Sequence, residues 1–242
     1  MKILALESST AHGSVALIDS DDVKFQTSSR EQKSHSEIIH TFIEQGLKQL
    51  QWKVADIDLF ASTIGPGSFT GIRVSINSAK SFAFVFNKPI IGVDSLLNMA
   101  HVNFEILKHS METKTITCMI NAYKNMVYLG QYTLKDGKIS VVTAPTVVRV
   151  QDLGSVIKDK TLVVGDGYTV YEPHFSDQIK PLSLRPTGLY DYPTAEMTGR
   201  LAKQIWVDNK STSTFEWKLI LPLYLRASEA EENKKGIKYT PL

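Results

Sequence analysis

The secondary structure expected at the start of the chain occurs in an order that few folds accommodate. Three strand-like runs come first, and they are rich in β-branched and apolar residues: 2–8, 13–19 and 23–29. Short polar segments separate these runs, and the sequence Ser-Asp-Asp at 20–22 suits a hairpin turn. We therefore expect the chain to begin with an antiparallel meander.

Helices and strands alternate after the meander. Apolar residues at helical intervals predict helices over 34–50, 70–86 and 95–109, and continuous apolar runs predict strands at 57–63 and 89–94. Such alternation favours a parallel extension of the sheet. The complete order is three strands, then helix, strand, helix, strand and helix. It is the order of the ribonuclease-H-like half of the actin-like (ASKHA) architecture, so we expect an α/β fold of that kind.

The second half of the chain carries fewer signals. Strand-like runs occur at 115–120, 126–134, 138–143 and 161–167, and a helical pattern covers 194–206. We expect two subdomains, of which the second is reduced. Their predicted bounds are residues 1–110 and 111–230, with a charged tail at 231–242.

Charge and cysteine content restrict the partners and the compartment. Lys and Arg number 27 and Asp and Glu number 25, a net charge of +2 that is too small for a strong nucleic-acid footprint. If RNA is involved, a partner is expected to supply much of the positive surface. The single cysteine, Cys118, excludes an internal disulfide and fits a reducing compartment. No apolar run reaches the length of a membrane-spanning helix, so we expect a cytoplasmic protein without membrane contact.

The segment Gly65–Arg73 (GPGSFTGIR) joins a predicted strand to a predicted helix. Free amides at the start of a helix can bind an anion, so Gly67 and Ser68 are candidate phosphate contacts. The alternative is a tight turn that brings the helix close to the sheet. The lysine and the spacing of a Walker loop are missing. Under either interpretation Ser68 or Thr70 can cap the helix, and we predict that Gly67 or Gly71 occupies a place that excludes a side chain.

The turn after the first strand is the second candidate site. In actin-like kinases this turn holds phosphate, and here Ser8, Ser9 and Thr10 could contact it. Glu7 stands where a catalytic member needs a carboxylate to hold a metal ion near the phosphate. A plain turn after a strand explains the same residues without a function, and the sequence leaves both interpretations open.

Neither a metal site nor a complete nucleotide site is expected. His35 and His40 are five residues apart, which places them about 140° apart on a helix, too far to share a metal ion. The chain contains no Gly-Gly pair, and its second half lacks the glycine-rich adenosine loop of an actin-like ATPase. We therefore expect no catalytic residue, no metal and no cofactor.

The apolar arcs of the helices over 34–50 and 70–86 are wider than one-sided packing requires. Either each helix is buried between the sheet and its neighbour, or one flank receives a partner protein. Gly46, near the centre of its arc, suggests close approach by another helix. Arg73 lies near the positive end of a helix dipole, which suggests an external contact. The candidate partner contacts are His35, Ile39, Phe42, Gly46, Arg73, Val74, Ser78 and Phe82.

Several segments together resemble the TsaB family. They are LALESSTAHGSVALID, the helix start SHSEII, the loop GPGSFTGIRVSINSAKSFA and the run PIIGVDSL, which span nearly all of the first 96 residues. NAYKNMVYLG, with Lys124 near a place where arginine is common, GDG at 165–167 and LPLYLR at 221–226 resemble later landmarks of the family. The loop is the most specific of these segments.

The resemblance implies a non-catalytic subunit of the bacterial machinery that makes threonylcarbamoyladenosine in tRNA. It implies a helix bundle with the catalytic paralogue TsaD, which transfers a threonylcarbamoyl group to an adenosine next to the anticodon. It also implies association with the small ATPase TsaE, contact with tRNA through the complex, and a homodimer as one option for the free chain. The alternatives are an actin-like small-molecule kinase, a metalloprotease-like protein and a self-associating scaffold unrelated to RNA.

Overall fold

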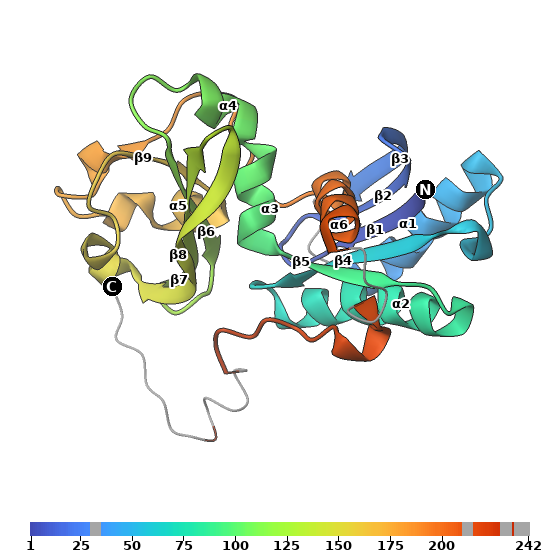
Figure 1. The fold of residues 1–242 in the computed structure, drawn as a ribbon. Helices are drawn as coiled ribbons and strands as arrows, with labels where there is room; N and C mark the ends of the chain where they lie inside the picture. Colours follow the sequence, from blue (N-terminus) through green and yellow to red (C-terminus); the bar gives the residue numbers. More distant parts are fainter. Residues whose placement is uncertain (30–34, 210–214, 228–233, 235–242) are drawn as a thin grey trace. The chain divides into compact units, whose positions relative to one another are not determined.

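The computed structural model describes residues 1–29, 35–209, 215–227 and 234, and the side chains of residues 35–37 fall outside this description. The chain forms two compact units (Figure 1). The first unit consists of Met1–Asn98 and Pro193–Leu223, and the second of Met99–Tyr192 and Tyr224–Leu242. The chain thus returns to the first unit after the second, whereas the sequence-based division treats residues 111–230 as continuous.

The first unit contains a five-stranded sheet in the order β3-β2-β1-β4-β5. The strands β1, β2 and β3 form the expected antiparallel meander, and β1, β4 and β5 run parallel. The strand bounds are β1 Lys2–Glu7, β2 Gly13–Asp19, β3 Asp22–Ser29, β4 Leu59–Gly65 and β5 Ile90–Asp94. Both the meander and the parallel extension predicted from the sequence are confirmed.

Helices cover both faces of this sheet because successive strand residues point to opposite sides. Leu4 and Leu6 pack with α1 (His35–Leu50) and α2 (Phe69–Phe86), and Ile3 and Ala5 pack with α6 (Ala195–Asn209). Figure 1 shows α2 and α6 on opposite sides of the sheet. The predicted start of the first helix, at residue 34, lies outside the described residues.

The second unit repeats the strand order of the first. Its sheet has the order β10-β9-β6-β7-β8, so both sheets read 3-2-1-4-5 when strands are counted from their own first strand. The bounds are β6 Thr115–Asn121, β7 Met126–Lys135, β8 Lys138–Arg149, β9 Thr161–Val164 and β10 Ser183–Leu184. The parallel pairs are β6 with β9 and β9 with β10. The predicted actin-like fold is confirmed.

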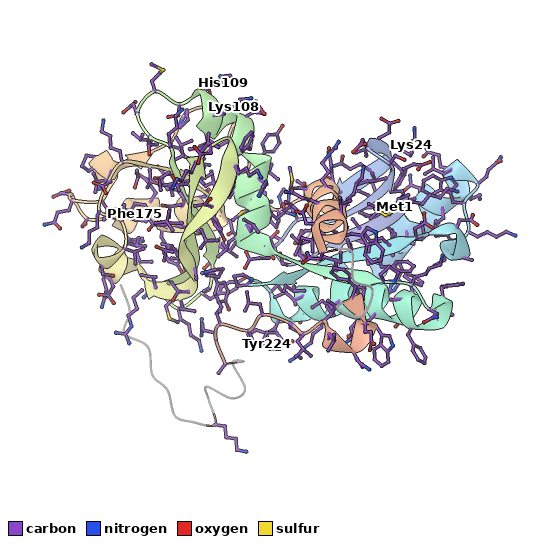
Figure 2. The ribbon with its side chains drawn as sticks, viewed as in Figure 1. Met1, Lys24, Lys108, His109, Phe175 and Tyr224 are labelled. Atoms are coloured by element: carbon purple, nitrogen blue, oxygen red, sulfur yellow. The ribbon has the colours of Figure 1, made fainter. Side chains whose placement is uncertain are left out.

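The second unit is reduced in its helices rather than in its sheet. The 3₁₀ helix η2 (Val150–Ser155) and the helix α5 (Asp166–Tyr171) stand at the places of α1 and α2, with six residues each against 16 and 18. Phe175, labelled in Figure 2, packs with Tyr171 in the core of this unit. The remaining 3₁₀ helices are η1 Val54–Asp56, η3 Glu172–His174, η4 Lys180–Leu182 and η6 Trp217–Leu219.

The single helix predicted over 95–109 is wrong, because the structure divides it into α3 (Ser95–Val102) and α4 (Phe104–His109). Asn103 stands at the break with φ −94° and ψ 10°. Its side-chain amide donates to the carbonyls of Met99 and Tyr190, and its side-chain oxygen accepts from the amide of Tyr190. Asparagine often competes with helical backbone bonds in this way. None of the described helices is both long and apolar enough to span a lipid bilayer.

Candidate functional site

The glycine loop, Gly65–Arg73, is bound tightly to the turn that follows β1. Ser68 caps α2 by accepting a hydrogen bond from the amide of Gly71 at 3.3 Å, as predicted. The Ser68 amide donates to the Ser9 carbonyl at 2.7 Å, and the Ser8 hydroxyl donates to the Gly71 carbonyl at 2.7 Å. Part of the hydrogen-bonding capacity of the loop and of the turn is therefore used in bonds between these two segments.

Two glycines make this close approach feasible. A Cβ atom on Gly67 would lie 2.0 Å from the Ser9 carbonyl oxygen, and one on Gly71 would lie 1.8 Å from the Ser8 carbonyl oxygen. The prediction that a side chain is excluded here is confirmed for both positions, and the tight-turn interpretation describes the loop. Phosphate contact by the five candidates stays a prediction: Ser8, Ser9, Thr10 and Gly67 are buried and Ser68 is exposed.

Glu7 ends β1 as a fully buried carboxyl group. Its Oε1 atom accepts from the amide of Ser9 at 2.6 Å, from the Ser9 hydroxyl at 2.5 Å and from the Thr63 hydroxyl at 3.3 Å. Its Oε2 atom has no hydrogen-bond partner among the described residues. Burial raises the pKa of Glu7 to about 8, and the hydrogen bonds from Ser9 and Thr63 oppose part of this rise. The carboxyl group is therefore mostly protonated at neutral pH.

Metal ligands do not gather at this turn. Over the part of the chain that the structure describes, no group of three His, Cys, Asp or Glu side chains could hold a metal ion. The Glu7 carboxyl bonds to its own turn instead, and the Ser95 hydroxyl extends the network by donating to the Ser9 hydroxyl at 2.8 Å. The arrangement holds the end of β1, the glycine loop and the start of α3 together.

A second candidate site lies on the surface of α1 and α2. A hollow of about 300 Å³ is lined by His40, Thr70, Arg73, Val74, Asn77 and Ser78; we call it the α1–α2 hollow. The Nε2 atom of His40 lies 3.1 Å from the Ser78 hydroxyl. Arg73, Val74 and Ser78 were predicted partner contacts, and the structure brings them together. His40, Thr70 and Asn77 were missed. The spacing of Thr70 and Asn77 from Arg73 already places them on the same flank of α2, whereas His40 lies on α1 and its approach to Ser78 is seen only in the structure.

Two predicted partner contacts are wrong because they face the interior of the first unit. Ile39 is fully buried in the core between the sheet and the helices. A Cβ atom on Gly46 would lie 2.5 Å from Cδ1 of Phe25 and 2.8 Å from Cδ1 of Leu17. Gly46 therefore lets α1 approach its own sheet rather than a second protein.

Of the remaining candidates, two are intermediate in burial. Phe42 and Phe82 are partly buried and pack against the same core, where the Phe82 ring stacks on Phe60 with centroids 5.7 Å apart. The side chain of His35 lies outside the described residues. The wide arcs are thus explained mainly by contact with the sheet and between the helices, and the lining of the α1–α2 hollow is mostly polar.

Comparison with known proteins identifies the family. A sequence model of the TsaD family, tRNA N6-adenosine threonylcarbamoyltransferase, matches residues 29–234. The tRNA threonylcarbamoyladenosine biosynthesis protein TsaB of Buchnera aphidicola (subsp. Schizaphis graminum) is 30% identical over 171 residues, which cover 69% of this chain and 79% of that protein. The chain belongs to the TsaB family. The family predicted from the glycine loop together with the other family-like segments is therefore confirmed.

The likeness to TsaB proteins extends over both units. TsaB of Escherichia coli (strain K12) is 28% identical over 246 residues, which cover 98% of this chain and 99% of that protein. The solved structure of YeaZ from Pseudomonas aeruginosa superposes with a TM-score of 0.76, at 23% identity, over 93% of this chain and 99% of that chain. This TsaB-family chain thus shares the fold of YeaZ over both of its units.

Proposed function

We propose that this TsaB-family chain is a subunit of the system that makes threonylcarbamoyladenosine in tRNA, where it supports a TsaD-type transferase. The observation that carries the proposal is the nearly complete alignment with a tRNA threonylcarbamoyladenosine biosynthesis protein from E. coli. The match of most of the chain to the TsaD family supports it. Such a function belongs in the cytoplasm, as expected from the composition.

We further propose that the chain has no catalytic site of its own. The glycine loop supports this, because the Ser8 hydroxyl and the Ser9 carbonyl are bonded to the loop itself. The Glu7 carboxyl supports it as well, because its Oε1 atom already accepts hydrogen bonds from Ser9 and Thr63. Activity in the system would then depend on TsaD, with TsaE as a further partner and tRNA held mainly by the complex.

The partner surface that we propose is the exposed flank of α1 and α2 around the α1–α2 hollow. Arg73 and Asn77 are exposed there, and Val74 is half-buried between them and the core. A protein interface usually has an apolar core and a polar rim, so the polar residues of the hollow would belong to the rim and the half-buried Val74 to the core. The same flank would serve a homodimer of the free chain, which TsaD would then replace.

Reconstitution with one component omitted at a time tests the function. The chain, TsaD and TsaE are co-purified, supplied with threonylcarbamoyl-adenylate and tRNA, and the modified nucleoside is quantified by mass spectrometry. We expect a stable complex and loss of the modified nucleoside when the chain is left out. Full modification without the chain would contradict the proposal. ATP turnover by the chain alone would favour the kinase alternative, and chelator-sensitive peptide cleavage would favour the protease.

Asn77→Trp tests the surface without disturbing the core. Asn77 is exposed in the hollow, so the indole should block docking while the chain stays folded. We expect the affinity for TsaD to fall roughly tenfold or more, equivalent to about 1.4 kcal/mol, at an unchanged melting temperature. Binding is measured by calorimetry.

Two further variants serve as controls. Gln204→Trp makes the same amide-to-indole change at an exposed position of α6, which covers the opposite face of the sheet, and should leave binding intact. Ile39→Glu would bury an unpaired charge and should lower stability itself. Equal affinities for wild type and Asn77→Trp would place the TsaD surface elsewhere.

A further inference from the structure

The turn between β6 and β7, residues 122–125, holds three successive residues in the left-handed region. Tyr123 has φ +57°, Lys124 +53° and Asn125 +61°. Residues with a Cβ atom adopt this conformation singly, and a run of them is unfavourable. Such strain persists only where the surroundings fix the backbone, and it concentrates at functional sites. The β6–β7 turn therefore needs an explanation beyond linking two strands.

Side chains from distant segments of the second unit fix this turn from inside. The Tyr171 hydroxyl donates to Oδ1 of Asn121 at 3.1 Å, and Oδ1 of Asp166 accepts from the Asn121 amide at 2.9 Å. The guanidinium of Arg226 donates to the Ala122 carbonyl. The turn is thus held rigidly in its strained form, so a ligand would not have to order it.

The outer side of the turn presents aromatic and basic side chains. Tyr123 is 64% exposed. Tyr224, labelled in Figure 2, is 39% exposed and precedes Arg226, the residue that bonds to the turn. Lys124 belongs to the turn itself and is half-buried, and the exposed Arg149 pairs with Met126 at the first position of β7.

Two acidic groups near this surface, among the described residues, lie inside it or farther along the chain. Asp166 is bonded inward to the Asn121 amide, and burial raises its pKa. Asp152 is exposed on η2, past Arg149 in the chain. Stacking on an aromatic ring beside cations that meet phosphates is the common mode of binding unpaired RNA bases. The turn combines both groups on a rigid backbone.

We propose that the β6–β7 turn contacts tRNA directly, with Tyr123 stacked on an unpaired base and Lys124 and Arg149 on the adjacent phosphates. This inference rests on the proposed function and adds a direct RNA contact to a subunit expected to meet tRNA only through its partners. The small net charge of +2 is compatible with it, because one base and two phosphates need no broad basic surface. Arg226 is a positioning residue, since its guanidinium donates to the backbone carbonyls of Ala122 and Tyr123 in the turn.

The test measures tRNA affinity and subunit assembly separately. The complex of the chain with TsaD and TsaE is titrated into a tRNA labelled at its 3′ end, and fluorescence anisotropy is followed at several salt concentrations. Tyr123→Ala should raise the Kd for tRNA roughly fivefold or more, while Tyr123→Phe, which keeps the ring, should stay near the wild type. Lys124→Ala should lower the slope of log K against log salt by about one. Lys138→Ala changes an exposed lysine at the start of β8, paired with the last residue of β7 and so at the far end of this strand pair, and is the control.

The possible results separate the inference from the proposed function. Unchanged tRNA affinity and salt slope in both Tyr123→Ala and Lys124→Ala would overturn the inference, while the complex would still form. If Tyr123→Ala weakened the binding of TsaD or TsaE but not of tRNA, the turn would be a protein contact and the inference would also fall. A wild-type chain that does not join the complex would contradict the proposed function before any variant is measured.

Discussion

Gly71→Ala should lower the free energy of unfolding by about 3 kcal/mol or more, although it adds a single methyl group. The added carbon would stand 1.8 Å from the Ser8 carbonyl oxygen, which is a backbone atom at the end of β1 and has no flexible side chain to move aside. Either α2 or the β1 turn must shift, and the bond from the Ser8 hydroxyl to the Gly71 carbonyl would be strained with it. Urea denaturation followed by circular dichroism measures the loss.

Gly154→Ala provides the matched comparison. Gly154 lies in η2, and a Cβ atom there would meet only Cδ1 of Ile179, at the ordinary distance of 3.9 Å. The same substitution should therefore change stability by less than about 0.5 kcal/mol. If Gly71→Ala were as mild as Gly154→Ala, the glycine loop would be able to move away from the β1 turn, and a phosphate between them would become plausible again.

Glu7→Gln should make the protein more stable than the wild type at pH 8 and remove part of its pH dependence. The pKa of Glu7 is about 8 in the folded state against 4.5 as its ordinary value, so the folded state keeps a proton that the unfolded state releases. The contribution of Glu7 is fully present below pH 4.5. It falls by roughly 1.4 kcal/mol per pH unit as the pH rises towards 8, and it is constant above that. Glutamine keeps the shape and the accepting oxygen but does not titrate.

The measurement is the difference in unfolding free energy between Glu7→Gln and wild type from pH 4 to pH 9, because other titrating groups contribute equally to both. We expect the difference to move in favour of the variant across the window from 4.5 to 8. Parallel curves would mean that the carboxyl group ionises in the folded protein as easily as in the unfolded one. Ser95→Ala, which removes a hydroxyl bonded to Ser9 rather than to Glu7, should leave the pH profile unchanged.

The sequence predicts the first unit well because its signals are local. Each strand of the meander alternates or runs apolar within a few residues, and the cap at Ser68 depends only on the residues that follow it. The family could also be predicted from the sequence, since the glycine loop, its most specific segment, is continuous. The division of the helix at Asn103 could not be predicted in this way, because it depends on hydrogen bonds to Tyr190, which is 87 positions away.

Sequence periodicity does not show whether a residue on the apolar arc of a helix faces a partner protein or the core of its own unit. Gly46 and Ile39 sit on the apolar arc of α1 just as a partner contact would, and only the position of Phe25 and Leu17 on the sheet shows that they face inward. The burial of Glu7 beside Ser9 and Thr63 likewise depends on the pairing of β1 with β4. The left-handed residues Tyr123, Lys124 and Asn125 include no glycine, so the sequence does not indicate their conformation.

The late position of α6 in the chain has a consequence for biosynthesis. One face of the first sheet, with Ile3, Ala5 and Ala16, is covered by residues 195–209, which are translated after the segment Met99–Tyr192 of the second unit. At a translation rate of about 5–20 residues per second, synthesis of the segment from Met99 to Tyr192 takes roughly 5–20 s. During that interval the nascent first unit carries an uncovered apolar sheet face. Chains that terminate before α6 should therefore aggregate or be degraded, whatever the state of the strands already made.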